Sequence, residues 1–108
     1  MDIEKQYEGL TNALKNTVPF KAFPHRELVQ ELRKKDYVIT LKTQLSVKDI
    51  YNSGDITGIV CMLEETKDGA IVCALTKLDI PKSHPLSKEI RAYQKKRIKR
   101  LKKMNQRN

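Results

Sequence analysis

The spacing of apolar residues predicts two helices in the first third of the chain. In the first segment, apolar side chains recur at intervals of four, three and four residues, at Ile3, Tyr7, Leu10 and Leu14. This spacing puts them on one face of a helix over residues 2–15, with Asp2 as its N-cap. A second helix is expected over 25–35, because Pro24 suits a first helical turn and the apolar residues that follow share one face. A proline-containing connector over 17–23 is expected to join the two helices.

The alternation of apolar and polar residues predicts strands in the middle of the chain. Residues 37–45 alternate throughout, as expected of a strand with one buried face. A capping-box pattern over 46–49 then predicts a single helical turn, and the chain is expected to reverse at 52–55. Two further apolar runs, 56–65 and 70–78, are expected to pair as a hairpin.

The loop of this hairpin is expected to comprise residues 67–69, because Gly69 readily supplies the positive φ that a three-residue loop requires. Such a loop gives two cross-strand pairs, Cys61 with Leu75 and Leu63 with Cys73. It keeps the larger apolar side chains on one face of the hairpin, whereas a loop of two or four residues would divide them between both faces.

These elements predict the α+β class: a single domain in which helices cover a three-stranded antiparallel meander, in the order α-α-β-β-β-α. The last element is expected to be a long basic helix over 86–104, because two prolines end the sheet just before it. We assign residues 1–104 to the domain and expect residues 105–108 to form a disordered tail. With 108 residues, 39% of them hydrophobic, the chain is long enough for one core and too short for two.

Positive charge is concentrated at the C-terminal end of the chain. The whole sequence has 22 Lys and Arg residues against 13 Asp and Glu residues. From Pro85 to Asn108 there are ten basic residues and one acidic residue, Glu89, so this segment has a formal charge of +9. The preceding residues hold equal numbers of each sign and are formally neutral. A localised charge of this kind attracts a particular class of partner, whereas an evenly spread charge bears mainly on solubility.

On a helical wheel, the segment 86–104 has an apolar stripe opposite a basic half. The stripe contains Leu86, Ile90, Tyr93, Ile98, Leu101 and Met104. Arg97 is an exception among the cations, because it falls in the middle of this stripe. A buried guanidinium without a partner would be costly there, so we expect Arg97 either to extend to the surface or to find an acidic partner.

The basic half of this helix favours nucleic acid as the partner, because each contact with a phosphate releases condensed counterions. The candidate binding residues are Arg91, Lys95, Lys96, Arg97, Lys99, Arg100, Lys102 and Lys103. We interpret the chain as a non-catalytic nucleic-acid-binding accessory protein, with RNA or a ribonucleoprotein favoured as its partner. The structural alternative is a charged face that is simply solvated.

Two other functions are compatible with the sequence. The first is a protein-interaction subunit of a larger assembly, in which the basic helix docks on an acidic protein surface. The second is a small, metal-independent, toxin-like ribonuclease, because the 2′-hydroxyl of RNA supplies its own nucleophile. Its candidate catalytic residues are Tyr93, Arg97, His84 and Lys77. A helix lying on a membrane surface is less favoured, because the apolar stripe lacks Trp and Phe.

No metal site or cofactor is predicted. The chain has two histidines and two cysteines, and the cysteines are twelve residues apart. Cys61 and Cys73 lie among apolar residues, which predicts buried free thiols. His84 directly precedes the basic helix, so we expect it to have a structural role at the start of that helix.

A cytoplasmic location is expected. Residues 1–15 lack the basic and apolar regions of a secretory signal. No apolar run approaches the roughly 18 residues of a membrane span.

Overall fold

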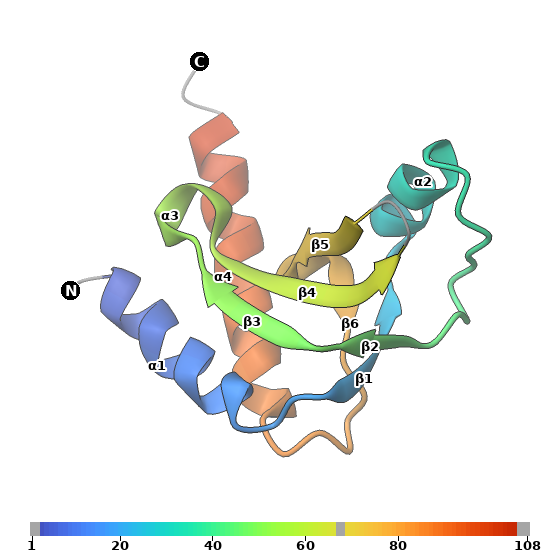
Figure 1. Ribbon diagram of the computed structural model, residues 1–108. Coiled ribbons are helices and arrows are strands. Elements are labelled where there is room, and N and C mark those ends of the chain that lie inside the picture. The colour runs from blue at the N-terminus through green and yellow to red at the C-terminus, as the bar shows by residue number, and fades with distance from the viewer. Residues whose placement is uncertain (1–2, 67–68, 106–108) are drawn as a thin grey trace.

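The computed structural model describes residues 3–66 and 69–105 (Figure 1). In chain order its elements are α1 (Ile3–Lys15), β1 (Phe20–Pro24), α2 (Arg26–Lys34), β2 (Leu45–Val47), β3 (Asp49–Asn52), α3 (Gly54–Thr57), β4 (Ile59–Thr66), β5 (Gly69–Ala74), the 3-10 turn η1 (Leu75–Lys77), β6 (Leu78–Asp79) and α4 (Ser87–Asn105). The predicted α+β class is confirmed, and the long helices lie close to their expected positions. Asn105 is the last residue of α4, and the rest of the expected tail, 106–108, lies outside the described residues.

The strands form two three-stranded antiparallel sheets, ordered β2-β1-β6 and β3-β4-β5. The second sheet is a three-stranded antiparallel meander, as predicted, but its first strand is β3 and not the expected strand over 37–45. The first sheet was not expected. β2 and β3 are separated by Lys48 alone, so one bent segment contributes a strand to each sheet (Figure 1). At this bend the Lys48 N–H donates to the Met62 carbonyl at 2.8 Å, which ties the segment to β4.

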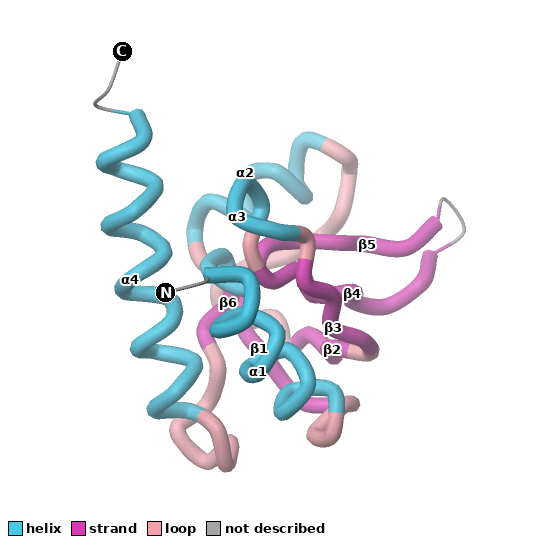
Figure 2. Tube along the Cα trace, turned by 90° about the vertical axis from the view of Figure 1, so that its left-hand side faces the viewer, coloured by secondary structure: helices cyan, strands magenta, loops and turns pink. Residues whose placement is uncertain are grey.

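The core lies between the sheets and the three longer helices (Figure 2). α1 packs against β3, α2 against β1 and η1, and α4 against η1. Both sheets and all three helices contribute side chains that are at most 2% exposed: Leu14, Leu28, Val47, Ile50, Ile59, Cys61, Leu63, Leu75, Leu78 and Ile90. One continuous core therefore fixes the position of α4 relative to the sheets.

The strand expected over 37–45 is wrong for all but its last residue. Residues 36–44, which we call the 36–44 loop, have no regular secondary structure. The Thr43 N–H donates to the Thr40 carbonyl and closes a turn where the strand would have continued. Val38 is fully exposed, whereas Ile39 is 4% exposed. From Tyr37 to Leu45 the odd-numbered residues are buried or partly buried, except Leu41, and the even-numbered residues are exposed. This near-alternation arises without a partner strand, so periodicity alone cannot distinguish this loop from a strand.

The helical turn expected after residue 46 is also wrong, because this segment forms β2 and the start of β3. Val47 and Ile50 are both fully buried, and pairing with β1 and β4 satisfies the backbone that a helical turn would have used. The single helical turn lies further along the chain, in α3.

The expected hairpin forms, but its register differs. Cys61 pairs with Cys73 and Thr66 with Gly69, and a register shift lies between Met62 and Glu65. The predicted pairs, Cys61 with Leu75 and Leu63 with Cys73, are therefore wrong. The three-residue loop was expected to keep the larger apolar side chains on one face of the hairpin. The register shift in β4 has this effect instead, because apolar side chains on both strands remain buried. Residues 67 and 68 of the expected loop lie outside the described residues.

Candidate nucleic-acid interface

The first half of α4 is anchored to the rest of the fold. Ile90 is fully buried and Tyr93 is 8% exposed. The Gln94 side-chain amide donates to the carbonyls of Leu75 and Leu78, at 2.9 and 2.7 Å. These carbonyls belong to η1 and β6, which places α4 along one side of the molecule (Figure 2). Apolar packing and two hydrogen bonds thus hold the helix in one orientation.

Arg97 continues this anchor rather than reaching the surface. Its residue is 2% exposed, and its guanidinium carbon lies 6.0 Å from the centroid of the Tyr7 ring. The neighbouring Tyr93 hydroxyl accepts a hydrogen bond from the Ile59 N–H at 2.9 Å. Tyr7 and Tyr93 meet edge to face, with 5.2 Å between ring centroids. Arg97 therefore belongs to the buried contact between α1, α4 and β4, and it is not available to a phosphate.

Gly58 makes this close packing possible. Its φ is +74°, a backbone conformation that side chains rarely adopt. A Cβ atom at this position would collide with the Tyr93 hydroxyl and lie 2.9 Å from the Arg97 Nε. The absence of a side chain at Gly58 therefore lets the chain before β4 lie directly against the anchored side of α4.

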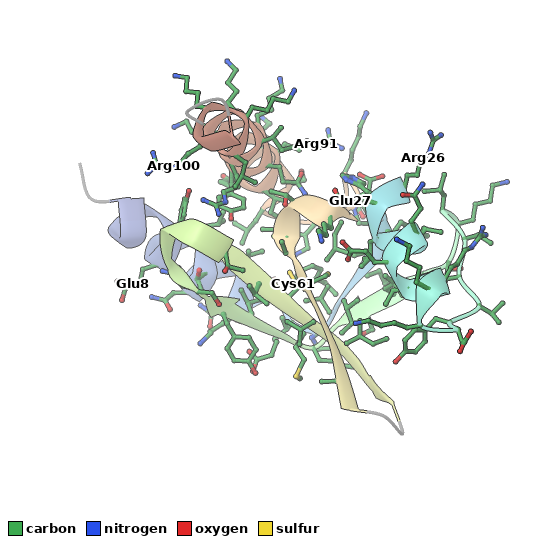
Figure 3. The ribbon with its side chains drawn as sticks, turned by 90° about the horizontal axis from the view of Figure 1, so that it is seen from above. Glu8, Arg26, Glu27, Cys61, Arg91 and Arg100 are labelled. Atoms are coloured by element: carbon green, nitrogen blue, oxygen red, sulfur yellow. The ribbon has the colours of Figure 1, made fainter. Side chains whose placement is uncertain are left out.

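The opposite side of α4 carries exposed cations, which we call the cationic face. Its members are Lys88, Arg91, Lys95, Lys96, Lys99, Lys102 and Lys103, all exposed. In a view from above, the long side chains of α4 extend away from the sheets (Figure 3). Arg100, another candidate, is partly exposed. All the predicted binding residues lie on α4, and all of them are exposed except Arg97, which is buried, and Arg100, which is partly exposed.

Carboxylates do not neutralise the cationic face within the part of the chain that the structure describes. An ion pair of 2.6 Å joins Lys77 of η1 and Glu31 of α2, and it involves no residue of the cationic face. Glu89 is the one acidic residue of α4. Like charges spaced three and four residues apart on a helix repel one another, at a cost of a few tenths of a kcal/mol per pair. An anion bound along this face would relieve that repulsion.

His84 fixes the chain just before α4 begins. The Leu86 N–H donates to the His84 Nδ1 at 3.0 Å, so the neutral ring carries its proton on Nε2. That Nε2 lies 3.1 Å from the Thr17 hydroxyl, which in turn donates to the Leu14 carbonyl. The ring also packs edge to face on Phe20. The expected structural role of His84 at the start of the helix is confirmed, and it connects α4 to the end of α1.

Acid is expected to weaken this connection. Burial lowers the pKa of His84 below its ordinary value of 6.5, because the charged ring is poorly solvated. As the pH falls below about 6.5, the unfolded chain takes up this proton before the folded one does, so stability is lost. The stability advantage of the wild type over a His84→Gln variant should shrink between neutral pH and about pH 5, as measured by urea unfolding. The control is His25→Gln, which replaces an exposed histidine. If the stability difference between the wild type and this variant changed with pH in the same way, the assignment to His84 would be contradicted.

The four residues considered for a ribonuclease site do not come together in one site. Tyr93 and Arg97 are buried beneath Gly58, His84 contacts Thr17, and Lys77 pairs with Glu31.

The predicted free, buried thiols are confirmed, because Cys61 and Cys73 form no disulfide. Burial raises the pKa of Cys73 to about 12 and that of Cys61 further, so both remain protonated at neutral pH.

Within residues 3–66 and 69–105, no three His, Cys, Asp or Glu side chains group as metal ligands would. Of the helices described, none combines the length and apolar character needed to cross a bilayer. Comparison of the chain with family models, curated proteins and solved structures gave no match.

Proposed function

We propose that this protein binds nucleic acid without catalysing a reaction on it, with RNA or a ribonucleoprotein as the favoured partner. The observation that supports this proposal is the cationic face of α4. Seven exposed basic side chains lie on a helix whose first half is anchored to the core along its other side. Because the anchor holds the helix in place, its charges are already arranged when an anionic surface approaches. Steering of an anion by such a field accelerates association.

The contacts are expected to be with phosphates and not with bases. Tyr93, the one aromatic residue of α4, is buried and hydrogen-bonded to the Ile59 N–H. It therefore offers no surface on which a base could stack. Lysine side chains act as mobile point charges and do not read base edges with the geometry of paired arginine contacts. Binding should consequently depend on backbone charge and on the shape of the nucleic acid, as in recognition of double-stranded RNA.

The helix matches nucleic acid in size. Nineteen residues at about 1.5 Å each give a length of roughly 28 Å. Each strand of a B-form DNA duplex has one phosphate about every 3.4 Å, so a duplex of about 12 base pairs, slightly shorter in the A form of RNA, is comparable in length to the 40 Å longest dimension of the protein. Four to six of the seven cations can then meet phosphates at once.

A salt titration of RNA binding tests the proposal. Binding of a fluorescent duplex of about 12 base pairs is measured by anisotropy between roughly 50 and 200 mM salt. With four to six phosphate contacts, a plot of log affinity against log salt should have a slope of about −4 to −5. Affinity that does not change with salt, or no binding at the lowest salt, would contradict the proposal. The RNA should be recovered intact in the presence of a chelator, and its cleavage would favour the ribonuclease alternative.

A further inference from the structure

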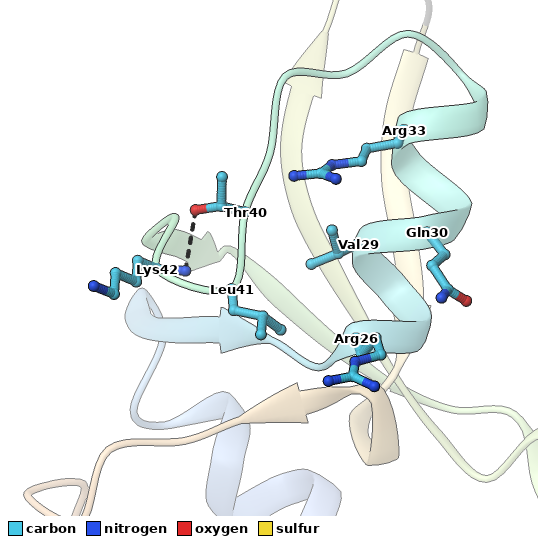
Figure 4. Close-up of a pocket in the computed structure, with 7 residues that line it drawn as sticks. All are labelled: Arg26, Val29, Gln30, Arg33, Thr40, Leu41 and Lys42. Atoms are coloured by element: carbon cyan, nitrogen blue, oxygen red, sulfur yellow. Dashed lines mark hydrogen bonds between the residues drawn. The ribbon is translucent and has the colours of Figure 1, made fainter.

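A pocket of about 590 Å³ lies between α2 and the 36–44 loop (Figure 4), and none of its lining residues belongs to α4. On the helix side it is lined by Arg26, Val29, Gln30 and Arg33. These residues are three, four and seven positions apart, so they share one face of α2. On the loop side it is lined by Thr40, Leu41 and Lys42. The pocket thus depends on the loop folding back along the helix.

The pocket combines cations with an apolar surface. Arg26, Arg33 and Lys42 line it, and no acidic residue does. Val29 is 6% exposed and forms part of the floor, whereas Leu41 is 51% exposed and points across the opening toward α2 (Figure 4). An inorganic anion would use only the cations. A ligand that uses both features needs a negative group together with a flat or apolar body.

The pocket is also preorganised. The Arg33 Nε donates to the Ile39 carbonyl at 2.9 Å, which holds the guanidinium group against the loop. Within the loop, the Thr40 N–H donates to the Thr43 hydroxyl at 2.9 Å and the Lys42 N–H to the Thr40 hydroxyl at 3.2 Å. These bonds hold Leu41 and Lys42 at the rim. Ligand binding therefore need not order the loop, which lowers its entropic cost.

We propose that this pocket takes one nucleotide of the bound RNA, and this inference rests on the proposed function. The phosphate would contact Arg26 or Arg33 at one end of the pocket, and Lys42 would turn toward it from the rim, while the sugar and base would lie against Leu41 and Val29. A planar guanidinium can also stack on a base, which a lysine cannot do. Figure 3 shows Arg26 of α2 and Arg91 of α4 extending toward the same side of the molecule. We therefore expect one RNA to contact both the pocket and the cationic face.

The test uses the full chain and uridine monophosphate as the probe, in an NMR titration to millimolar concentration. The nucleotide should shift the Arg33 Nε–H signal and the Leu41 methyl signals. In a double variant, Arg26→Gln with Lys42→Gln, the affinity should fall about 10-fold or more, because two of the three cations are lost. This variant leaves the Arg33 hydrogen bond to Ile39 intact. The matched control is Lys34→Gln with Lys35→Gln, which removes the same charge from exposed residues outside the pocket and should bind normally.

Three results would overturn the inference. They are the absence of shifts at Leu41 and Arg33, equal weakening in the control variant, and identical Leu41 shifts with inorganic phosphate alone. The last would mean that only an anion binds. Failure of this inference is distinguishable from failure of the proposed function, because α4 is unchanged in the double variant. RNA affinity that is insensitive to the pocket variant but falls when the cationic face is neutralised overturns the pocket alone. Nucleotide binding in the pocket without any RNA binding overturns the proposed function alone.

Discussion

Replacing five lysines of the cationic face with glutamine is expected to lower RNA affinity about 100-fold. The replaced residues are Lys95, Lys96, Lys99, Lys102 and Lys103, all exposed. Near 0.1 M salt, each lost phosphate contact costs nearly a factor of ten, and at least two of the five must face the RNA if four of the seven cations do. Fluorescence anisotropy with the RNA duplex measures the loss. The fold should be retained, because none of these side chains contributes to the buried core.

A matched variant separates the position of the charge from its amount. Replacing Lys21, Lys34, Lys35, Lys48 and Lys82 with glutamine also removes five positive charges, from exposed positions outside α4. This control should lower affinity only several-fold, because distant charges act through a field that salt screens within about 10 Å. If both variants weaken binding equally, net charge and not the cationic face is responsible.

Substituting Gly58 is expected to cause the largest loss of stability. In a Gly58→Ala variant, the added Cβ would meet the Tyr93 hydroxyl and the Arg97 Nε, at a backbone φ of +74°. Strain of this kind costs about 1–3 kcal/mol, and overpacking adds a similar amount. We therefore expect a loss of about 3 kcal/mol or more and a melting temperature lower by about 12 °C or more in thermal unfolding.

The control for this substitution is Gly9→Ala. Gly9 lies within α1, and a Cβ there would meet nothing within 4 Å. Alanine suits a helix interior better than glycine, so this variant should be more stable by about 0.5–1 kcal/mol. If Gly58→Ala behaved like Gly9→Ala, Arg97 and Tyr93 would not be packed against Gly58, and the described anchor of α4 would be incorrect.

The anchor explains why the cationic face can stay exposed. Ile90, Tyr93, Gln94 and Arg97 use one side of α4 for contacts with the core, with β4 and with η1. Apolar residues at helical spacing predicted this side from sequence, because burial of an amphipathic helix follows its apolar stripe. The exception was Arg97. The wheel placed it within the stripe, but only the approach of Gly58 and Tyr7 shows that the fold accommodates a guanidinium there.

The cations that line the pocket beside α2 could not be predicted from the sequence. Arg26 and Arg33 share a helix face by spacing alone, but that pattern is typical of solvated helices. Lys42 joins them because the 36–44 loop turns back at Thr40 and Thr43. The alternating residues of this segment predicted a strand, which would have carried Lys42 away from α2. Because the sequence predicted a strand here, it did not predict that Lys42 would lie near Arg26 and Arg33. The turn that brings them together depends on side-chain hydrogen bonds, which periodicity does not detect.

The change in salt dependence on neutralising the cationic face tests the central claim most directly. Log affinity for the RNA duplex is measured against log salt for the wild type and for the variant with the five lysines of α4 replaced. Each phosphate that those lysines neutralise contributes about 0.9 to the slope. The account predicts that the variant's slope is shallower by about 2 or more. Equal slopes for the two proteins would contradict it, because the charges of α4 would then displace no counterions from the RNA.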